Sequence, residues 1–261
     1  MRRRLAVLAA VLGTGCTEVT TDPNAVVAVR FDGSAYPSIV AADSLRDSLG
    51  ALQPLVATGL NYKGDPIPDA EFVFSSPDTV LRVFDSGNVF ATRRKTDATP
   101  ARVFATAGSL QSVPDSLFVV QRADSLKRNQ EADTIIVASG GGASADTGAV
   151  TFGVFGDTAT GKPKAPVPSW LVSFQLRYHG TTIPPTDTSY AYTFVVTNNR
   201  RVPTHIDTTD AGGIASRRLF VRSLSVPQDT VVLIATIRQR KANTSPIRDS
   251  AFIVIRPNTT P

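Results

Sequence analysis

The segment SWLVSFQLRYH (169–179) shows most clearly how this chain folds. Val172, Phe174, Leu176 and Tyr178 alternate in it with polar residues. Because the side chains of a β-strand point alternately to its two sides, this period of two predicts a strand with one buried side and one solvent-facing side. Trp170, the only tryptophan, stands just before the alternation, where it fits the core or the rim of a β-sandwich.

Short runs rich in Val, Ile, Phe and Tyr flank this strand in both directions. The other strands predicted in the same half are TIIVAS (134–139), VTFGVF (150–155), SYAYTFVVT (189–197), GIASRRLFVRS (213–223), DTVVLIATIRQR (229–240) and DSAFIVIR (249–256). Those predicted in the first half are VVAVRF (26–31), PLVATGLNY (54–62), EFVFS (71–75), VLRVF (80–84), NVFAT (88–92), ARVFATA (101–107) and SLFVVQ (116–121). Short strands separated by Gly, Pro, Asp and Ser predict an all-β fold of sandwich type.

The pattern disfavours other fold classes. Strands do not alternate with helical segments, so a parallel α/β sheet is not expected. One stretch, SIVAADSLRDSLGAL (38–52), is read as a loop that could include a helical turn. The chain has a single cysteine, so no intramolecular disulfide can form and apolar burial must stabilise each domain.

The two groups of strands are separated by RADSLKRNQEAD (122–133), which is charged and almost free of large apolar residues. It predicts an interdomain linker. The expected organisation is a signal peptide at 1–15, a tether at 16–24, a first sandwich at 25–122, a linker at 123–132, a second, more elaborate sandwich at 133–256 and a tail at 257–261.

The N-terminus has the order of an export signal. Three arginines at positions 2–4 precede an apolar run at 5–12, and small residues then lead to Cys16. The run is too short for a transmembrane helix, which needs about 20 apolar residues. A buried N-terminal helix is the alternative, but Gly13 and Gly15 and the missing amphipathic period disfavour it.

With a cysteine at the cleavage point, this segment resembles a bacterial lipoprotein signal. Gly13 stands where the lipobox of that family usually has leucine, so the match is imperfect. The resemblance implies a diacylglyceryl thioether on Cys16, cleavage before it and anchoring in the membrane lipid through its acyl chains. Thr17 rather than Asp follows, which by the same resemblance favours the outer membrane. The alternative is a plain secreted protein with a free thiol.

Removal of the signal also changes what the charge means. The three signal arginines account for three of the five formal positive charges, so the mature chain carries +2. No Lys/Arg cluster with interleaved aromatic residues occurs, and no nucleic-acid partner is expected.

One segment imitates a phosphate-binding loop. GDTATGKP (156–163) reads G-x-x-x-x-G-K after a strand. A P-loop needs Ser or Thr next and a helix whose N-terminus faces the phosphates. Pro163, Pro166 and Pro168 prevent that helix, so a loop is predicted and no nucleotide cofactor is expected.

Other candidate centres also lack the required pattern. Asp207 and Asp210 in DTTDAGG (207–213) do not have the spacing of a calcium loop, and a turn held by Asp side chains is the expectation. His179 and His205 are the only histidines, too few for a zinc site, and no G-x-S-x-G elbow supports a serine hydrolase. The chain is therefore predicted to hold no metal or other cofactor and not to be an enzyme.

The stretch LVATGLNYKGDPIPDAEFVFSSPDTVLRVFDSGNVFAT (55–92) resembles the bacterial immunoglobulin-like domains of intimin- and invasin-type surface proteins. Lys63-Gly64 occupies the turn of that pattern, Ser75-Ser76-Pro77-Asp78 its middle and Gly87 to Ala91 its last part. Segments 157–176 and 207–221 are similar to the same superfamily, more weakly. The resemblance implies two tandem immunoglobulin-like sandwiches and no shared catalytic residues.

The function expected from these features is a lipid-anchored envelope protein that serves as a structural spacer, adhesion or binding module. A protein or glycan partner would bind the loops at 157–169 and 179–188. The alternative is a glycan-binding accessory sandwich of an envelope enzyme system. That alternative requires an exposed aromatic face, for which the candidates are Trp170, Tyr178, Tyr190 and Tyr192.

Overall fold

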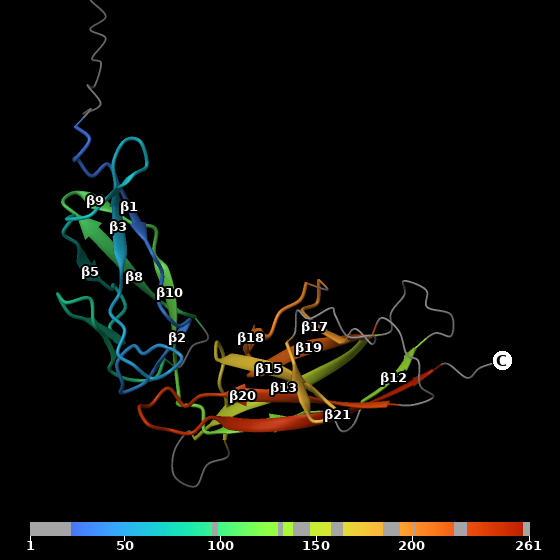
Figure 1. Cartoon of the computed structure of the whole chain (residues 1–261). Helices are drawn as coiled ribbons and strands as arrows, with labels where there is room; N and C mark the ends of the chain where they lie inside the picture. Colours follow the sequence, from blue (N-terminus) through green and yellow to red (C-terminus); the bar gives the residue numbers. More distant parts are fainter. Residues whose placement is uncertain are drawn as a thin grey trace, which may run out of the picture.

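The computed structural model describes residues 22–95, 99–129, 133–137, 147–157, 164–184, 194–200, 202–221 and 229–257. These residues form strands and loops arranged as two β-sandwiches, which confirms the predicted all-β class (Figure 1). Within them, no helix has the length and apolar character needed to cross a membrane.

The first sandwich contains strands β1 to β10. Their bounds are β1 Ala28–Phe31, β2 Ser38–Val40, β3 Ala57–Leu60, β4 Pro66–Ile67, β5 Val73–Ser75, β6 Leu81–Val83, β7 Val89–Ala91, β8 Ala101–Ala107, β9 Leu110–Gln111 and β10 Asp115–Val120. One sheet has the order β1-β3-β4, another has the order β2-β10-β8-β5 with β9 beside β8, and β6 and β7 form a hairpin. A buried apolar cluster that includes Ile39, Leu55, Val89, Val103 and Leu117 lies between them.

The second sandwich contains strands β11 to β21. Their bounds are β11 Ser125–Arg128, β12 Asp133–Val137, β13 Thr147–Gly156, β14 Ala165–Pro166, β15 Leu171–Tyr178, β16 Thr181–Ile183, β17 Phe194–Thr197, β18 Ile206–Thr208, β19 Ile214–Val221, β20 Asp229–Ile237 and β21 Ile247–Pro257. One sheet has the order β11-β13-β19-β17 and the other the order β12-β21-β20-β15-β16, with β14 and β18 attached at β13 and β15.

The strand order in the second sandwich is that of an immunoglobulin-type fold, in which the first, second, fifth and fourth strands form one sheet and the third, sixth and seventh form the other. Here β11, β13, β19 and β17 form the first of these sheets, and β15, β20 and β21 form the second. In both sandwiches the first strand is divided between the sheets. β1 pairs antiparallel with β3 and β2 pairs parallel with β10; likewise β11 pairs antiparallel with β13 and β12 pairs parallel with β21. The two halves of the chain therefore share one construction.

The alternating apolar residues of the segment 169–179 belong to the core of the second sandwich. Val172, Phe174, Leu176 and Tyr178 on β15 are buried, and they face inward residues of β13 and β19. Phe174 meets Phe152 edge to face, with ring centroids 5.9 Å apart. The strand prediction for 169–179 is confirmed, because burial of one side selects the period of two.

The segment predicted as an interdomain linker is in part a strand. Ser125–Arg128 forms β11, which pairs with β13, and Leu126 is buried in the second core. The linker expectation for 123–132 is wrong for these residues. An edge strand tolerates charges on its open side, so Lys127 and Arg128 do not prevent pairing while the single Leu126 points inward.

The connection between the sandwiches is closely packed. Ala123 is fully buried, and Val40 and Val120 of the first sandwich belong to the apolar cluster of the second. A Cβ on Gly156 would lie 2.3 Å from the Arg122 carbonyl oxygen, so only glycine allows β13 to end against this connection. No flexible linker separates the two cores at this point.

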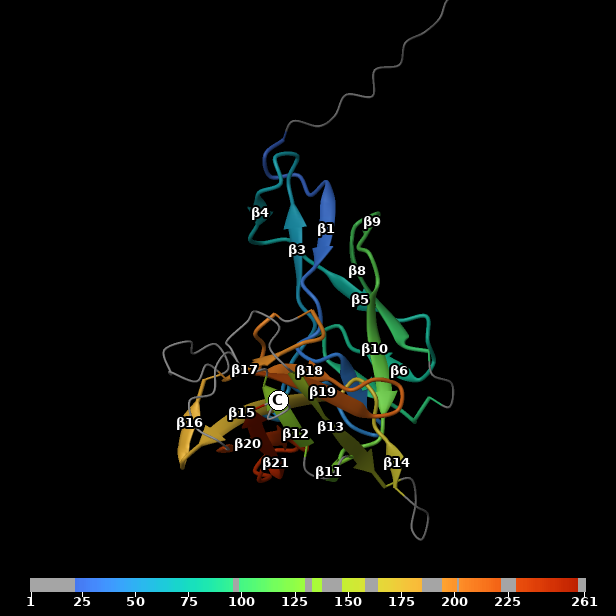
Figure 2. The same cartoon turned by 90° about the vertical axis from the view of Figure 1, so that its right-hand side faces the viewer.

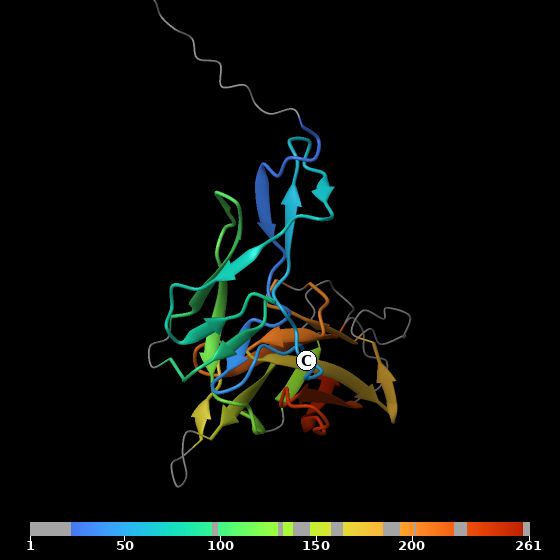
Figure 3. The same ribbon diagram turned by 90° about the vertical axis from the view of Figure 1, so that its left-hand side faces the viewer.

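The two sandwiches form an L (Figure 1). β10 points toward the second sandwich and ends near β14 (Figure 2), where the Gln121 amide donates to the carbonyl oxygens of Ala165 and Pro166 at 3.0 and 3.2 Å. β1 and β3 lie at the end of the first sandwich that is remote from the second (Figure 3). The segment 38–52 contains no helix; it begins with β2 and continues as a loop toward the second sandwich.

Candidate functional site

The most elaborate polar arrangement of the described residues lies where the two sandwiches meet. Arg240, in the turn between β20 and β21, is 1% exposed, although it is charged. Its Nη1 donates to Ser38 Oγ at 3.0 Å, and its Nη2 donates to the Arg46 carbonyl oxygen at 3.2 Å. The second sandwich therefore inserts a cation into a polar recess of the first.

Two aromatic rings surround that cation. The guanidinium carbon of Arg240 lies 3.7 Å from the centroid of Tyr36 and 5.0 Å from that of Trp170. The two rings meet edge to face with centroids 5.7 Å apart, and Tyr36 Oη accepts the Leu171 amide at 2.7 Å. A desolvated cation over two such faces is stabilised by cation–π attraction of about 2 kcal/mol.

Burial shifts the pKa values of Arg240 and Tyr36 but does not change their charges at neutral pH. It lowers the pKa of Arg240 to about 10 and raises the pKa of Tyr36 to about 12. At neutral pH, Arg240 is therefore still a cation and Tyr36 a neutral phenol. The contact is a cation over a neutral ring and not an ion pair between the two groups.

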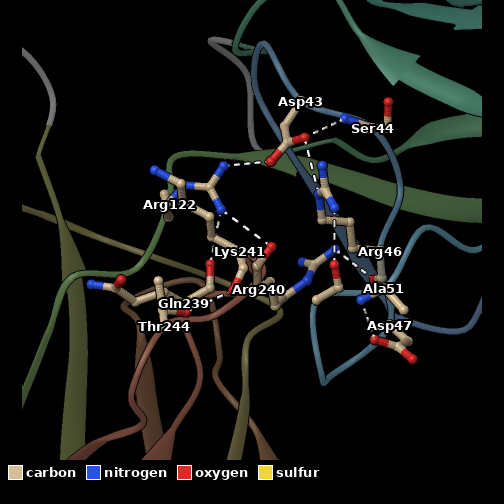
Figure 4. Close-up of polar contacts among 11 residues, drawn as sticks. Asp43, Ser44, Arg46, Asp47, Ala51, Arg122, Gln239, Arg240, Lys241 and Thr244 are labelled. Carbon is tan, nitrogen blue, oxygen red and sulfur yellow. Dashed lines mark hydrogen bonds and ion pairs between the residues drawn. The ribbon is translucent and has the colours of Figure 1, made fainter.

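A second layer of charges surrounds the turn (Figure 4). Arg122, at the start of the connection, donates from Nη1 to the carbonyl oxygens of Gln239 and Arg240 at 3.0 and 3.3 Å. Its Nη2 makes an ion pair with Asp43, which also accepts Arg46 Nε at 3.2 Å. Residues from the first sandwich, the connection and the second sandwich are thus joined in one network.

Asp43 gives this network a pH dependence. Burial raises the pKa of its carboxyl, but hydrogen bonds from Arg122, the Ser44 amide and Arg46 more than offset burial, and the pKa lies below its ordinary value of 3.8. A carboxyl with a lowered folded-state pKa stabilises the fold above its unfolded-state pKa, and this contribution is lost as the pH falls through the folded-state value.

We expect Asp43→Asn to lower the free energy of unfolding by about 1 kcal/mol at neutral pH, since it removes a partly buried ion pair. The variant should also lose less stability than the wild type when the pH falls below about 4, because it has no carboxyl to protonate there. Urea titrations over a pH series measure both effects. Asp85→Asn, in the turn between β6 and β7, is the matched control. A loss at Asp85 equal to that at Asp43 would contradict the role of the network.

Two concave surfaces flank the junction. One, of about 410 Å³, is lined by residues of β10 and by Arg94, Lys95, Thr99 and the segments at 166–169 and 209–211, which include Asp210. The other, of about 330 Å³, lies on the outer face of the β15–β20 sheet beside Tyr36. Both surfaces combine residues of the two sandwiches.

The aromatic face predicted for glycan binding is not formed as expected. Trp170 is 0% exposed beside Arg240, and its Nε1 donates to the Arg238 carbonyl oxygen at 3.1 Å. Tyr178 is 9% exposed and belongs to the core of the second sandwich. The expectation is wrong for these two residues, because strand alternation places both rings inside. Tyr190, Tyr192 and Cys16 lie outside the described residues.

Asp210 lies in a turn, as the sequence predicts, whereas Asp207 lies in strand β18. Asp210 Oδ1 accepts the amides of Gly212 and Ile214 at 2.8 and 2.9 Å, and Asp207 pairs with Arg217 at 2.9 Å. No group of three or more His, Cys, Asp or Glu that could hold a metal ion occurs in the described ranges.

The structure describes both histidines but only part of the P-loop-like segment and of the two loops expected to bind a partner. His179 has a φ of 45° and its ring stacks on Tyr178, while His205 is exposed. Of the P-loop-like segment 156–163, only Gly156 and Asp157 are among the described residues. The loops at 157–169 and 179–188 are likewise described only in part.

Sequence reasoning missed the residues that make the junction. Arg240 is the last residue of the strand predicted at 229–240, and the polar residues RQRKAN (238–243) around it do not indicate burial. The tyrosine at 36 lies in a Gly/Ser/Pro-rich connection. Neither segment carries a period or motif that indicates burial, because the burying groups are far away in the chain.

No protein-family model matches this chain, and neither does any curated protein. Among solved structures, it is similar to the periplasmic chaperone SfaE (10% identity, TM-score 0.33, covering 52% of this chain and 61% of that chain) and to the Yersinia pseudotuberculosis adhesin InvE (13%, 0.32, 90% and 61%). Surface layer protein SbsC, domains 4–9, is a further match (11%, 0.28, 90% and 32%).

The chain spans about 61% of the length of each of the first two structures. TM-scores this low do not establish a shared arrangement over the whole chain. The immunoglobulin-type fold rests instead on the strand order and on the divided first strand. The narrower resemblance to intimin- and invasin-type domains remains a prediction.

Proposed function

We propose that this protein is a non-catalytic, exported protein of the bacterial envelope, anchored by lipid on Cys16. Its two sandwiches would form a rigid spacer that presents a binding or adhesion surface. The observation that carries the proposal is the buried junction at Arg240, with its hydrogen bonds to Ser38 and Arg46. Domains in one chain move relative to each other by default unless their interface holds them. A rigid spacer therefore requires a junction of this kind.

The position of the chain ends supports a spacer. The described chain begins at residue 22, beside the remote end of the first sandwich, where the Asn61 amide donates to the Pro23 carbonyl oxygen at 3.1 Å (Figure 3). A tether at 16–24 that leads from a lipid would meet the first sandwich at that end. The second sandwich would then be the part held farther from the membrane, and its loops would be free to bind.

Anchoring is tested by Cys16→Ser. We expect the precursor to remain uncleaved and the protein to move from the membrane fraction to the soluble fraction, because the sulfur that would carry the diacylglyceryl group is absent. Thr14→Ser, two positions earlier, is the control and should leave partitioning unchanged. Fractionation and immunoblotting measure the result. If the serine variant partitions into membranes as the wild type does, lipid anchoring through Cys16 is wrong.

A further inference from the structure

The concave surface beside Tyr36 has the composition of an anion site. It is lined by residues of the outer faces of β15, β20 and β21, and none of the described lining residues is Asp or Glu. Two arginines, Arg238 and Arg248, contribute to it, and both are exposed. Neither side chain has an ion-pair or hydrogen-bond partner in the described part of the chain, so both cations face the surface uncompensated.

Strand register places the polar groups in a row. Ser173 on β15 pairs with Thr236 on β20, and Thr236 pairs with Arg248 on β21. Ile206 on β18 pairs with Ser173 from the other side and adds an apolar end. Neighbouring strands are about 4.8 Å apart, so the row from Ser173 to Arg248 spans about 10 Å, which matches one sugar ring with a substituent.

The junction contributes to this surface in two ways. Tyr36 and Ser48 of the first sandwich form one side of it. The buried Arg240 lies against the Tyr36 ring, 3.7 Å from its centroid, and adds a third positive charge next to this side of the surface. Trp170 holds the backbone of Arg238 through the bond to its carbonyl oxygen. The walls are thus fixed before a ligand binds, which reduces the entropic cost of binding.

We infer that this surface binds the anionic group of a sugar that carries a carboxylate or phosphate. Arg238 and Arg248 bind the charged group, since guanidinium groups pair with both oxyanions through two parallel hydrogen bonds. Ser173 and Thr236 bind ring hydroxyls, and Ile206 contacts the apolar face of the ring. The volume of about 330 Å³ lies within the range of small-molecule sites. This inference rests on the binding role proposed above and identifies its ligand class.

The test uses the full chain purified in non-ionic detergent and calorimetric titration with glucuronate, glucose 1-phosphate and glucose at equal ionic strength. We expect at least one charged sugar to bind about tenfold more tightly than glucose, and Arg238→Gln/Arg248→Gln to remove that advantage. Arg256→Gln, on the same face of β21 but outside the surface, is the control and should bind as the wild type does. The tighter of the two charged sugars identifies the group as carboxylate or phosphate.

Three results would overturn the inference: equal affinity for all three sugars, no saturable binding, or an equal loss in the Arg256 control. Circular dichroism checks that the double variant is folded, as expected for two exposed side chains. In the wild type itself, added salt should weaken binding of the charged sugar and leave glucose unaffected. Binding by the purified chain depends neither on Cys16 processing nor on localisation, so a negative result removes this site and leaves the anchoring proposal to its own test.

Discussion

Replacement of Arg240 by alanine should lower the free energy of unfolding by about 3 kcal/mol and loosen the contact between the two sandwiches. The substitution removes the cation from between Tyr36 and Trp170, and it leaves Ser38 Oγ and the Arg46 carbonyl oxygen without their partner. A truncated buried side chain also leaves a cavity, which adds to the cost.

The Arg240→Ala variant distinguishes the contribution of the junction from the contributions of the two cores. In the wild type, Val40 and Val120 join the apolar cluster of the second sandwich, so we expect one cooperative unfolding transition. With Arg240→Ala, the sandwiches should unfold at different denaturant concentrations. Small-angle X-ray scattering should show a broader distribution of shapes, because the angle between the domains is no longer held.

The single tryptophan provides a direct readout of the same change. Trp170 lies against Arg240, and its emission should shift to longer wavelength when water enters the junction. Arg238→Ala is the control, because that residue precedes the same turn and its side chain is exposed. If both variants unfold like the wild type with unchanged emission, Arg240 does not hold the domains together.

Replacement of Trp170 by alanine should cost about 4 kcal/mol, the largest effect that we expect of a single substitution in this protein. Trp170 is the largest fully buried side chain of the described residues, and it packs edge to face on Tyr36. Its loss opens a cavity and also leaves the Arg238 carbonyl oxygen without its donor.

Trp170→Phe is the informative partner variant. It retains most of the ring volume but removes the Nε1 donor, so it should lose roughly half as much stability as alanine. Urea unfolding followed by circular dichroism measures both. A loss below about 1 kcal/mol for the alanine variant would contradict a core role, and would return Trp170 to the exposed, ligand-stacking role predicted for it from the sequence.

The strands could be predicted where their pattern is local. Val172 to Tyr178 alternate because one side of β15 is buried, and that requirement is visible within eight residues. The runs that became β8, β19 and β20 could be predicted from their content of apolar and β-branched residues. β11, β14 and β18 were not predicted, because they are short and charged or contain proline, and they exist only through pairing with a longer neighbour.

The groups proposed to bind the sugar are also predictable only where their pattern is local. The sequence shows that β15 has polar residues on one side, but it does not show that Ser173 lies opposite Thr236 and Thr236 opposite Arg248. That row depends on the register of three strands that are far apart in the chain. The exposed aromatic face expected from Trp170 and Tyr178 was wrong, because both rings lie on the same side as Val172, and that side faces the core.

Composition and the pattern of apolar runs alone therefore determined that this chain is all-β and that it has two groups of strands. They also predict an export signal that ends before Cys16. Tertiary structure alone decided that the two sandwiches form one unit. Arg240 and its partner Ser38 are 202 residues apart in the chain, and no local pattern around either predicts burial. A charged side chain is stable in an interior only when its hydrogen-bond partners and aromatic neighbours surround it, and those partners come together only when both sandwiches have folded.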